Sequence, residues 1–248
     1  MSSIGFYNLE NLFDTLDTEG TNDFEFTPKG EMRYNTRVYT EKLQNLSSVI
    51  AQLAPDAPDG VAVLGVSEIE NRAVLEALVS HPNLAHRKYN VIHFEGPDKR
   101  GVDIGLLYQP KYFEVLSARP LPVSGVLENG DSLFTRDILL VSGLFLGEPM
   151  HFMVGHWPSR RGGEKASEPL RKRAAGVCRR AADSIFQKEP NAKIAIMGDL
   201  NDDPTNESIL HIVGAKGDTK KVEAKGFFNP FYKLFQKGIG SHAFNDAW

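Results

Sequence analysis

The segment 193–204 places the strongest constraint on how this chain can fold, because a short apolar run there ends in several polar residues. Residues 194–197, Ile-Ala-Ile-Met, have no polar break, which is typical of a strand buried on both faces. Asp199 and Asn201 follow two residues apart, so on an extended backbone both side chains leave on the same side. Such groups are unfavourable at the end of a buried strand unless something binds them. The competing interpretation is an Asx turn, since Asp, Asn and Pro all favour turns.

The rest of the chain alternates between apolar strand patterns and helical patterns, with Pro and Gly between them. Residues 9–35 are predicted to form a long surface loop, and residues 216–248 a packed but irregular segment. Strands outnumber helices and the helices are spread along the chain, which favours a layered α/β domain. The predicted strands are 3–8, 61–66, 90–95, 102–108, 112–117, 137–145, 150–156 and 194–201. The first predicted helix begins at Thr36 and is ended by Pro55, and the next two span 71–80 and 164–187. The last, at 206–213, follows Pro204 and is capped by Thr205.

The composition limits the kinds of partner that the chain can have. With 248 residues and a formal net charge of −4, it has the length of one large domain or two small ones and no overall basic field for nucleic acid. Contact with a polyanion would require a local patch or a bound cation. The single Cys178 excludes an internal disulfide. No apolar run approaches the roughly 20 residues needed to span a bilayer, and no signal peptide is visible. Cellular location and oligomeric state stay open.

Polar side chains follow four of the predicted strands at the point where each strand ends. They supply carboxylate and amide oxygens together with one imidazole, a set that suits a hard cation such as Mg²⁺, Mn²⁺ or Ca²⁺ better than zinc. No Cys or His cluster has zinc spacing, and no Gly-x-Ser-x-Gly or phosphate-binding glycine loop is present. The chain therefore favours a site for a cation plus a phosphate or carbonyl group. These residues are Asn8 with Glu10, Glu68, His156, and the pair Asp199 and Asn201.

Four short motifs, in this order, resemble the endonuclease/exonuclease/phosphatase superfamily. They are Phe-Tyr-Asn-Leu-Glu at 6–10, Leu-Gly-Val-Ser-Glu at 64–68, Val-Gly-His at 154–156 and Gly-Asp-Leu-Asn at 198–201. The resemblance runs from residue 4 to about residue 205. It implies an α/β fold in four layers, with two mixed β-sheets packed face to face between outer helices, and a single domain over residues 1–248. It also implies a divalent-metal-dependent phosphoesterase.

The resemblance assigns roles to the strand-end residues. It makes Glu68 the main metal ligand, with Asn8 and Glu10 beside the ion. His156 and Asn201 donate hydrogen bonds to phosphoryl oxygens in this scheme, and Asp199 orients the attacking water or takes its proton. Glu70 is the alternative to Glu68, but the apolar strand reaches Glu68 first.

Five further residues are candidates for substrate binding, and for the three arginines among them a solvated surface role is the alternative. Arg136 stands where the deoxyribonuclease-like branch has a phosphate-contacting Arg, and Arg160 and Arg161 follow the His motif on a glycine-containing loop. Asp103 is predicted to orient His156, and Tyr108 to pack on a sugar. No role is predicted for His81, His86, His93, His151, His211 or His242.

The C-terminal end departs from the family pattern, which finishes with an Asp-His pair. The sequence stops at Asn-Asp-Ala-Trp, residues 245–248, and no Asp precedes His242. This predicts a truncated domain with weak or absent activity. The leading functional interpretation is nuclease-like phosphodiester hydrolysis. The alternatives are a phosphatase acting on a small phosphate ester or a lipid headgroup, and a non-catalytic binding module of the same fold.

Overall fold

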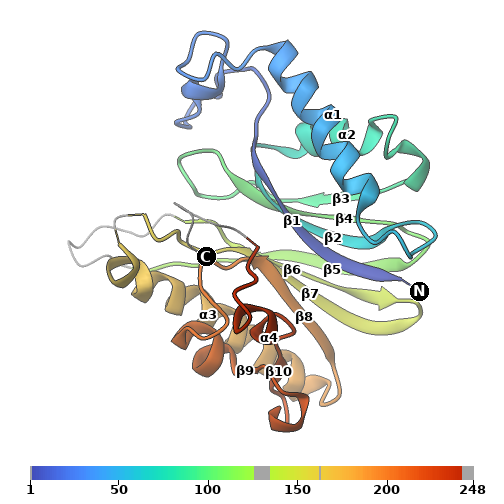
Figure 1. Cartoon of the computed structure of the whole chain (residues 1–248), viewed down its shortest axis with the longest axis vertical. Coiled ribbons are helices and arrows are strands. Elements are labelled where there is room, and N and C mark those ends of the chain that lie inside the picture. The colour runs from blue at the N-terminus through green and yellow to red at the C-terminus, as the bar shows by residue number, and fades with distance from the viewer. Residues whose placement is uncertain (1, 126–134, 162, 242–248) are drawn as a thin grey trace. The chain divides into compact units, whose positions relative to one another are not determined.

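A computed structural model describes residues 2–125, 135–161 and 163–241 of the chain (Figure 1). The chain divides into two compact units. The first contains Met1–His156 and Lys193–Asp199, and the second contains Trp157–Ala192 and Leu200–Trp248. Each unit is described separately below. The single domain expected from the sequence stays a prediction.

Two four-stranded mixed sheets form the first unit. One sheet has the order β1-β2-β4-β3, with β1 and β2 parallel and the other neighbours antiparallel. The other has the order β5-β6-β7-β8, in which only β7 and β8 are parallel. The strands are β1 Ser3–Leu12, β2 Val61–Ile69, β3 Asn90–His93, β4 Asp103–Tyr108, β5 Phe113–Leu121, β6 Ile138–Phe145, β7 Glu148–His156 and β8 Lys193–Asp199.

A shared apolar core joins the inner faces of these two sheets. Val63 and Leu106 from the first sheet pack in one cluster with Val141 and Phe152 from the second. Gly65 on β2 allows the close approach, because a Cβ there would lie 2.9 Å from Met197 Sδ. The predicted pair of mixed sheets packed face to face is therefore confirmed.

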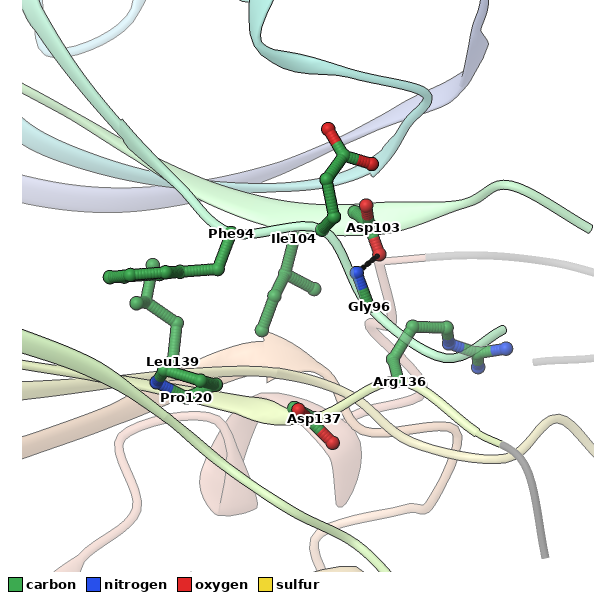
Figure 2. Close-up of a pocket in the computed structure, with 9 residues that line it drawn as sticks. Phe94, Gly96, Asp103, Ile104, Pro120, Arg136, Asp137 and Leu139 are labelled. Carbon is green, nitrogen blue, oxygen red and sulfur yellow. Dashed lines mark hydrogen bonds between the residues drawn. The ribbon is translucent and has the colours of Figure 1, made fainter. Parts of the chain in front are cut away.

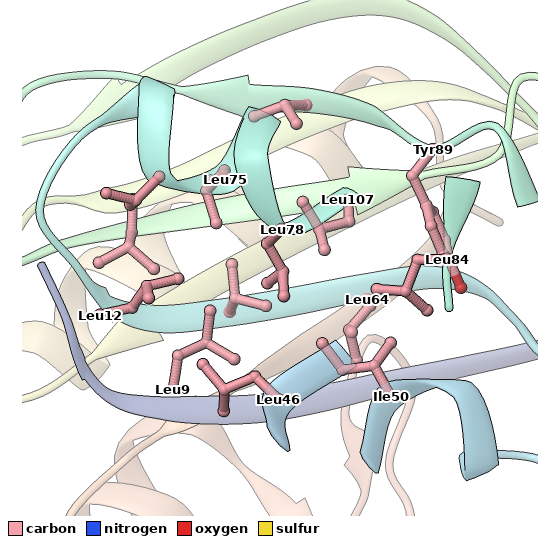
Figure 3. Close-up of a cluster of buried hydrophobic side chains, with 14 of the residues drawn as sticks. Leu9, Leu12, Leu46, Ile50, Leu64, Leu75, Leu78, Leu84, Tyr89 and Leu107 are labelled. Atoms are coloured by element: carbon pink, nitrogen blue, oxygen red, sulfur yellow. The ribbon is translucent and has the colours of Figure 1, made fainter. Parts of the chain in front are cut away.

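Helices α1 (Thr36–Gln52) and α2 (Arg72–Ser80) cover the outer face of the first sheet (Figure 1). Both begin at an Asn cap, Asn35 and Asn71, whose side-chain oxygen accepts backbone N–H groups of the first turn. The apolar stripes of the helices lie on buried strand residues, as Figure 3 shows. The cluster between helices and sheet includes Leu46, Ile50, Leu75 and Leu78 from the helices and Leu9, Leu12, Leu64 and Leu107 from the strands.

The segment between β1 and α1 differs from the predicted surface loop. Strand β1 extends to Leu12, and Phe13 and Tyr34 are buried with Val102 in a small cluster of their own. Phe26, in the short 3₁₀ helix Phe24–Phe26, stacks on Phe13 with ring centroids 4.2 Å apart. Aromatic burial within the segment was not visible from its polar composition.

The second unit is built on the long helix α3, Glu164–Lys188. Arg171 is fully buried in it, and its Nε donates to Asp202 Oδ1 at 2.5 Å. A helix follows Pro204 as predicted, but it is a short π-helix, Ser208–Val213, that begins after Glu207 and is not capped by Thr205. The remaining short elements of the chain are the 3₁₀ helices Ala85–Arg87 and Thr219–Lys221, strands β9 Ala215–Lys216 and β10 Phe227–Phe228, and α4 Tyr232–Phe235. Among the described residues, no helix combines the length and the apolar character needed to cross a bilayer.

Candidate active site

The carboxyl ends of four strands in the first unit bring polar side chains together. Asn8 on β1 lies opposite Ser67 on the parallel strand β2. In the other sheet, His156 on β7 lies opposite Asp199 on β8, also in a parallel pair. Parallel neighbours end at the same sheet edge, which is why residues so distant in the sequence meet there.

Hydrogen bonds from Asn8 connect the two sheets at this edge. Its Nδ2 lies 3.1 Å from both Glu68 Oε1 and Asp199 Oδ2, and donates to these two carboxylates. His156 Nε2 lies 3.7 Å from Glu68 Oε1. The four side chains therefore form one cluster, called the strand-end cluster below.

Glu68 reaches this cluster through an irregularity in β2. The register of β2 shifts between Ser67 and Ile69 against β4, so Glu68 has no opposite residue of its own. Its φ is +58°, in the left-handed region that an L residue rarely adopts. A bulge redirects a side chain away from the alternating faces of a strand. This strained turn aims the Glu68 carboxylate at the sheet edge, while Glu70 points elsewhere.

Glu70 has a separate environment. It is buried, and its carboxylate accepts hydrogen bonds from the Asp14 backbone N–H at 2.6 Å and Thr18 Oγ1 at 3.0 Å. Burial raises its pKa to about 7, an effect that nearby Asp14 and Asp23 strengthen and these hydrogen bonds oppose. Of the two glutamates weighed from the sequence, Glu68 is the one beside His156.

Close packing of two glycines fixes the His156–Asp199 pair. Gly155 and Gly198 lie opposite each other one residue earlier in the same ladder. A Cβ on Gly198 would lie 2.0 Å from the Gly155 carbonyl oxygen, and the φ of Gly198 is +154°. Only glycine fits this position, which accounts for the glycine before Asp199 in the sequence.

His156 is held in the neutral state by its surroundings. It is 5% exposed, and among the described residues its Nδ1 is buried without a hydrogen-bond partner. Burial lowers its pKa to about 3, and the nearby guanidinium groups of Arg136 and Arg100 add to the effect. The imidazole is therefore uncharged at neutral pH.

Arg136 holds the backbone of His156 in place through a hydrogen bond. It is buried, its Nε donates to the His156 carbonyl oxygen at 3.0 Å, and its Nη1 donates to Asp98 Oδ2 at 2.8 Å. Arg100 donates to the same carboxylate, with Nη2 2.7 Å from Asp98 Oδ2. Burial would raise the pKa of Asp98, but the hydrogen bonds from Arg100 and Arg136 outweigh it and hold the pKa at about 2. The guanidinium predicted to contact phosphate thus has protein acceptors for two of its nitrogens.

Lys42, on α1, is a site residue that the sequence did not reveal. Its Nζ donates to the Glu10 carbonyl oxygen. Burial lowers the pKa of Lys42, whereas the negative charges of Glu10 and Glu68 act to raise it. Glu10 is exposed, with φ +52°. A lysine in the middle of an amphipathic helix gives no signal of this kind in the sequence.

Two predicted substrate residues of the first unit lie apart from His156. Asp103 Oδ1 accepts from the Gly96 N–H at 3.0 Å, and its Oδ2 lies 3.1 Å from His93 Nε2, so both oxygens have partners other than His156. Tyr108 lies at the other end of β4, opposite Val63, and packs edge-on against Phe113. That end of the strand is roughly 17 Å from Asp103 at about 3.4 Å per residue.

The remaining predicted residues belong to the second unit. Asn201 was expected on an extended backbone, but β8 ends at Asp199 and the φ of Asn201 is +50°, so that expectation was wrong. Its Nδ2 donates to the Trp157 carbonyl oxygen at 2.9 Å. Arg160 Nε donates to the Asn201 carbonyl oxygen at 3.0 Å and its Nη2 to Asp203 at 2.8 Å. Arg161 is exposed.

The donor set at the strand ends fits a divalent cation. One ligand atom from each of Glu68, His156 and Asp199 lies within 4.8 Å of the others. Two carboxylates and the adjacent Asn8 carboxamide suit Mg²⁺ or Mn²⁺. The fold and the site together define the class of protein, which is an α/β sandwich with a polar site at the strand ends of its two packed sheets.

Comparison with known proteins gives the family. Residues 3–248 match the model of the Endonuclease/Exonuclease/phosphatase family, and the chain therefore belongs to that family. A comparison with curated proteins finds no match.

Solved structures share the fold at low sequence identity. An endonuclease/exonuclease/phosphatase family protein from Bacteroides thetaiotaomicron has a TM-score of 0.54 and 15% identity, over 86% of this chain and 66% of that one. D. rerio TDP2, complexed with a single strand DNA product, has a TM-score of 0.51 and 17% identity, over 85% of this chain and 64% of that one. The chain thus spans less than two thirds of the length of either structure.

Proposed function

We propose that the chain is a divalent-metal-dependent phosphoesterase that hydrolyses phosphodiesters, in a nuclease-like reaction, by attack of water. The observation that carries this proposal is the meeting of Asn8, Glu68, His156 and Asp199 at one edge of two sheets. Membership of the family supports it, as does the single strand DNA product with which D. rerio TDP2 is complexed.

Glu68 is the main ligand for Mg²⁺, or for Mn²⁺ or Ca²⁺, in this proposal. Asn8 holds the Glu68 carboxylate through its Nδ2, and Glu10 adds a carboxylate at the rim. When bound, the cation polarises a phosphoryl oxygen and stabilises charge on the leaving oxygen.

His156 and Asp199 share the chemistry of the attack. Because its pKa is low, His156 stays neutral and donates a hydrogen bond to a non-bridging phosphoryl oxygen, as an oxyanion-hole donor does. Asp199 accepts from Asn8 through Oδ2, which fixes the carboxylate that orients the attacking water or takes its proton. Arg136 positions His156 by holding its carbonyl oxygen.

The substrate residues that the sequence predicts in the second unit keep their roles as predictions. For Asn201 this role is a second hydrogen bond to the phosphoryl group. Arg160 is fixed by Asp203, so the exposed Arg161 is the better candidate for a phosphate of the substrate backbone. Such local cations would offset the net charge of −4.

The test is an assay of the purified chain with Mg²⁺ on plasmid DNA, RNA and a panel of phosphate esters, including lipid headgroup esters. The expected result is weak cleavage of nucleic acid that Glu68→Gln lowers about 10²-fold or more. Glu76→Gln, at an exposed glutamate on α2 paired with Arg72, should retain it. Cleavage of esters without cleavage of nucleic acid would replace the nuclease by a phosphatase. Binding of nucleic acid that survives Glu68→Gln, with no turnover on any substrate, would point to a binding module.

A further inference from the structure

A second group of metal-ligating side chains lies where β3 ends and β4 begins. His93 is the last residue of β3, Asp103 is the first residue of β4, and Glu95 stands in the loop between them. One ligand atom from each lies within 4.8 Å of the other two. We call these three residues the hairpin cluster. The proposed phosphoesterase reaction uses none of them.

The spacing of the donors fits a single ion. His93 Nε2 and Asp103 Oδ2 are 3.1 Å apart. Two ligands of one ion, each bound at roughly 2.0–2.2 Å, are separated by about this distance. Glu95 Oε1 lies 3.7 Å from the other ring nitrogen, and its side chain is 74% exposed, so it can turn to complete a coordination shell.

The two inner ligands are held in place by their surroundings. The side chains of His93 and Asp103 are 2% and 7% exposed, respectively. The Gly96 N–H donates to Asp103 Oδ1 at 3.0 Å, and a Cβ on Gly96 would lie 2.4 Å from that oxygen. Ligating carboxylates are oriented by such outer hydrogen bonds. The loop therefore supports the carboxylate with a backbone donor, and the absence of a side chain on Gly96 lets the two groups approach closely.

A small hollow adjoins the cluster, as Figure 2 shows. Its volume of about 10 Å³ has room for one water-sized particle, and Glu95, Asp103 and Asp137 line it. Arg136 also lines the hollow, but its Nε and Nη1 donate to His156 and Asp98. Three carboxylates therefore line a space of ionic size, and a cation bound there would neutralise their charge.

We propose that the hairpin cluster is a second cation site, and that it takes a transition-metal ion of the Zn²⁺ or Mn²⁺ type. An imidazole nitrogen with two carboxylates is a donor set that these ions accept. The strand-end cluster also has one imidazole and two carboxylates, but it adds the carboxamide of Asn8. The chain thus holds two cations on one pair of sheets.

The experiment measures Zn²⁺ bound to the full chain in millimolar Mg²⁺, by competition with a chromogenic chelator. One Zn²⁺ per chain is expected. Glu95→Gln, at an exposed ligand that the fold does not need, should weaken Zn²⁺ binding about tenfold or more, and His93→Gln and Asp103→Asn should abolish it. Thermal unfolding with and without Zn²⁺ provides a second readout, since an ion bound only to the folded state raises the Tm.

His151→Gln provides the matched control. This buried histidine on β7 lies outside the cluster, with Nδ1 2.7 Å from Ser142 Oγ, and its replacement should leave Zn²⁺ affinity unchanged. Absence of Zn²⁺ binding to the wild-type chain would overturn the proposal. So would Zn²⁺ binding that survives all three cluster substitutions, or that disappears only in Glu68→Gln, which would assign the ion to the strand-end cluster.

Discussion

The strand-end cluster and the hairpin cluster reach similar donor sets by different routes. The strand-end cluster combines residues from β1, β2, β7 and β8 and depends on the packing of two sheets. The hairpin cluster comes from two antiparallel neighbours and their connecting loop. The comparison teaches that a long-range site depends on the whole core, whereas a local site depends on one hairpin register.

Backbone strain also separates the two clusters. Glu10, Asn11 and Glu68, at or beside the strand-end cluster, have φ between +52° and +61°. No residue of the hairpin cluster is among the described residues with positive φ. Strained residues persist only where the surrounding structure determines them, and they gather at functional sites. Strain of this kind supports the strand-end cluster as the reactive one.

The largest expected effect comes from replacing Arg136, a buried arginine that contacts His156 of the strand-end cluster and lines the hollow beside the hairpin cluster. Replacing Arg136 by Met removes the donor to His156 and leaves the buried Asp98 carboxylate with Arg100 as its remaining guanidinium partner. We expect a loss of about 3–5 kcal/mol in the free energy of unfolding, measured with urea. Arg37→Met, at an exposed pair on α1, should change it by less than about 0.5 kcal/mol. Equal effects would show that Arg136 is not structural.

Replacing Glu68 by Gln should separate the clusters by function. We expect kcat/KM for phosphodiester hydrolysis to fall about 10²- to 10³-fold, because the ligand is lost while the side-chain shape is kept. Binding of Zn²⁺ at the hairpin cluster should persist in the same variant. A variant that hydrolyses at the wild-type rate would remove Glu68 from the reaction.

Asp98 is the ion-pair partner of Arg136, so the effect of acid on its carboxyl group tests how this arginine between the two clusters is held. Its carboxyl has a pKa of about 2 in the folded chain against an ordinary value of 3.8, so its contribution is complete above about pH 4 and is lost as the pH falls toward 2. The lowering corresponds to about 2 kcal/mol. Urea unfolding of wild type and Asp98→Asn should therefore differ most near neutral pH and converge near pH 2. A difference that is constant over this range would contradict the assignment.

The smallest effect is expected from Gly96→Ala, which changes no ligand. The added Cβ must displace the Asp103 carboxylate, and we expect Zn²⁺ affinity to fall about tenfold, as for the loss of an outer-shell contact. Ala57→Ser, which changes a small residue outside the hairpin cluster, is the control. Gly147→Ala is unsuitable as a control because the backbone φ of Gly147 is +83°. An unchanged affinity in Gly96→Ala would show that the loop does not fix the carboxylate.

Much of the fold could be predicted from local pattern. Apolar runs indicated the strands, and the polar residues at their ends marked Asn8, Glu68, His156 and Asp199, because the edge of a parallel pair collects whatever follows each strand. The hairpin cluster could not be found in this way. His93 and Asp103 meet only through the β3–β4 register, and hydrophobic pattern does not report which polar residues face each other across a hairpin.

Two other features were hidden for a different reason. The left-handed backbone at Glu68 and Asn201 was not predicted, because the apolar run before each residue indicates a strand that stays extended to its end. Lys42 reaches the strand-end cluster because α1 packs on β1, a contact that no local pattern encodes.

The tight ladder between β7 and β8 has a consequence for engineering. Because Gly155 and Gly198 leave no room for slippage, the relative height of His156 and Asp199 is set by the ladder and not by the length of the Trp157–Ala192 connection. An insertion in that connection should therefore leave the height of His156 against Asp199 unchanged, provided that the two glycines stay paired.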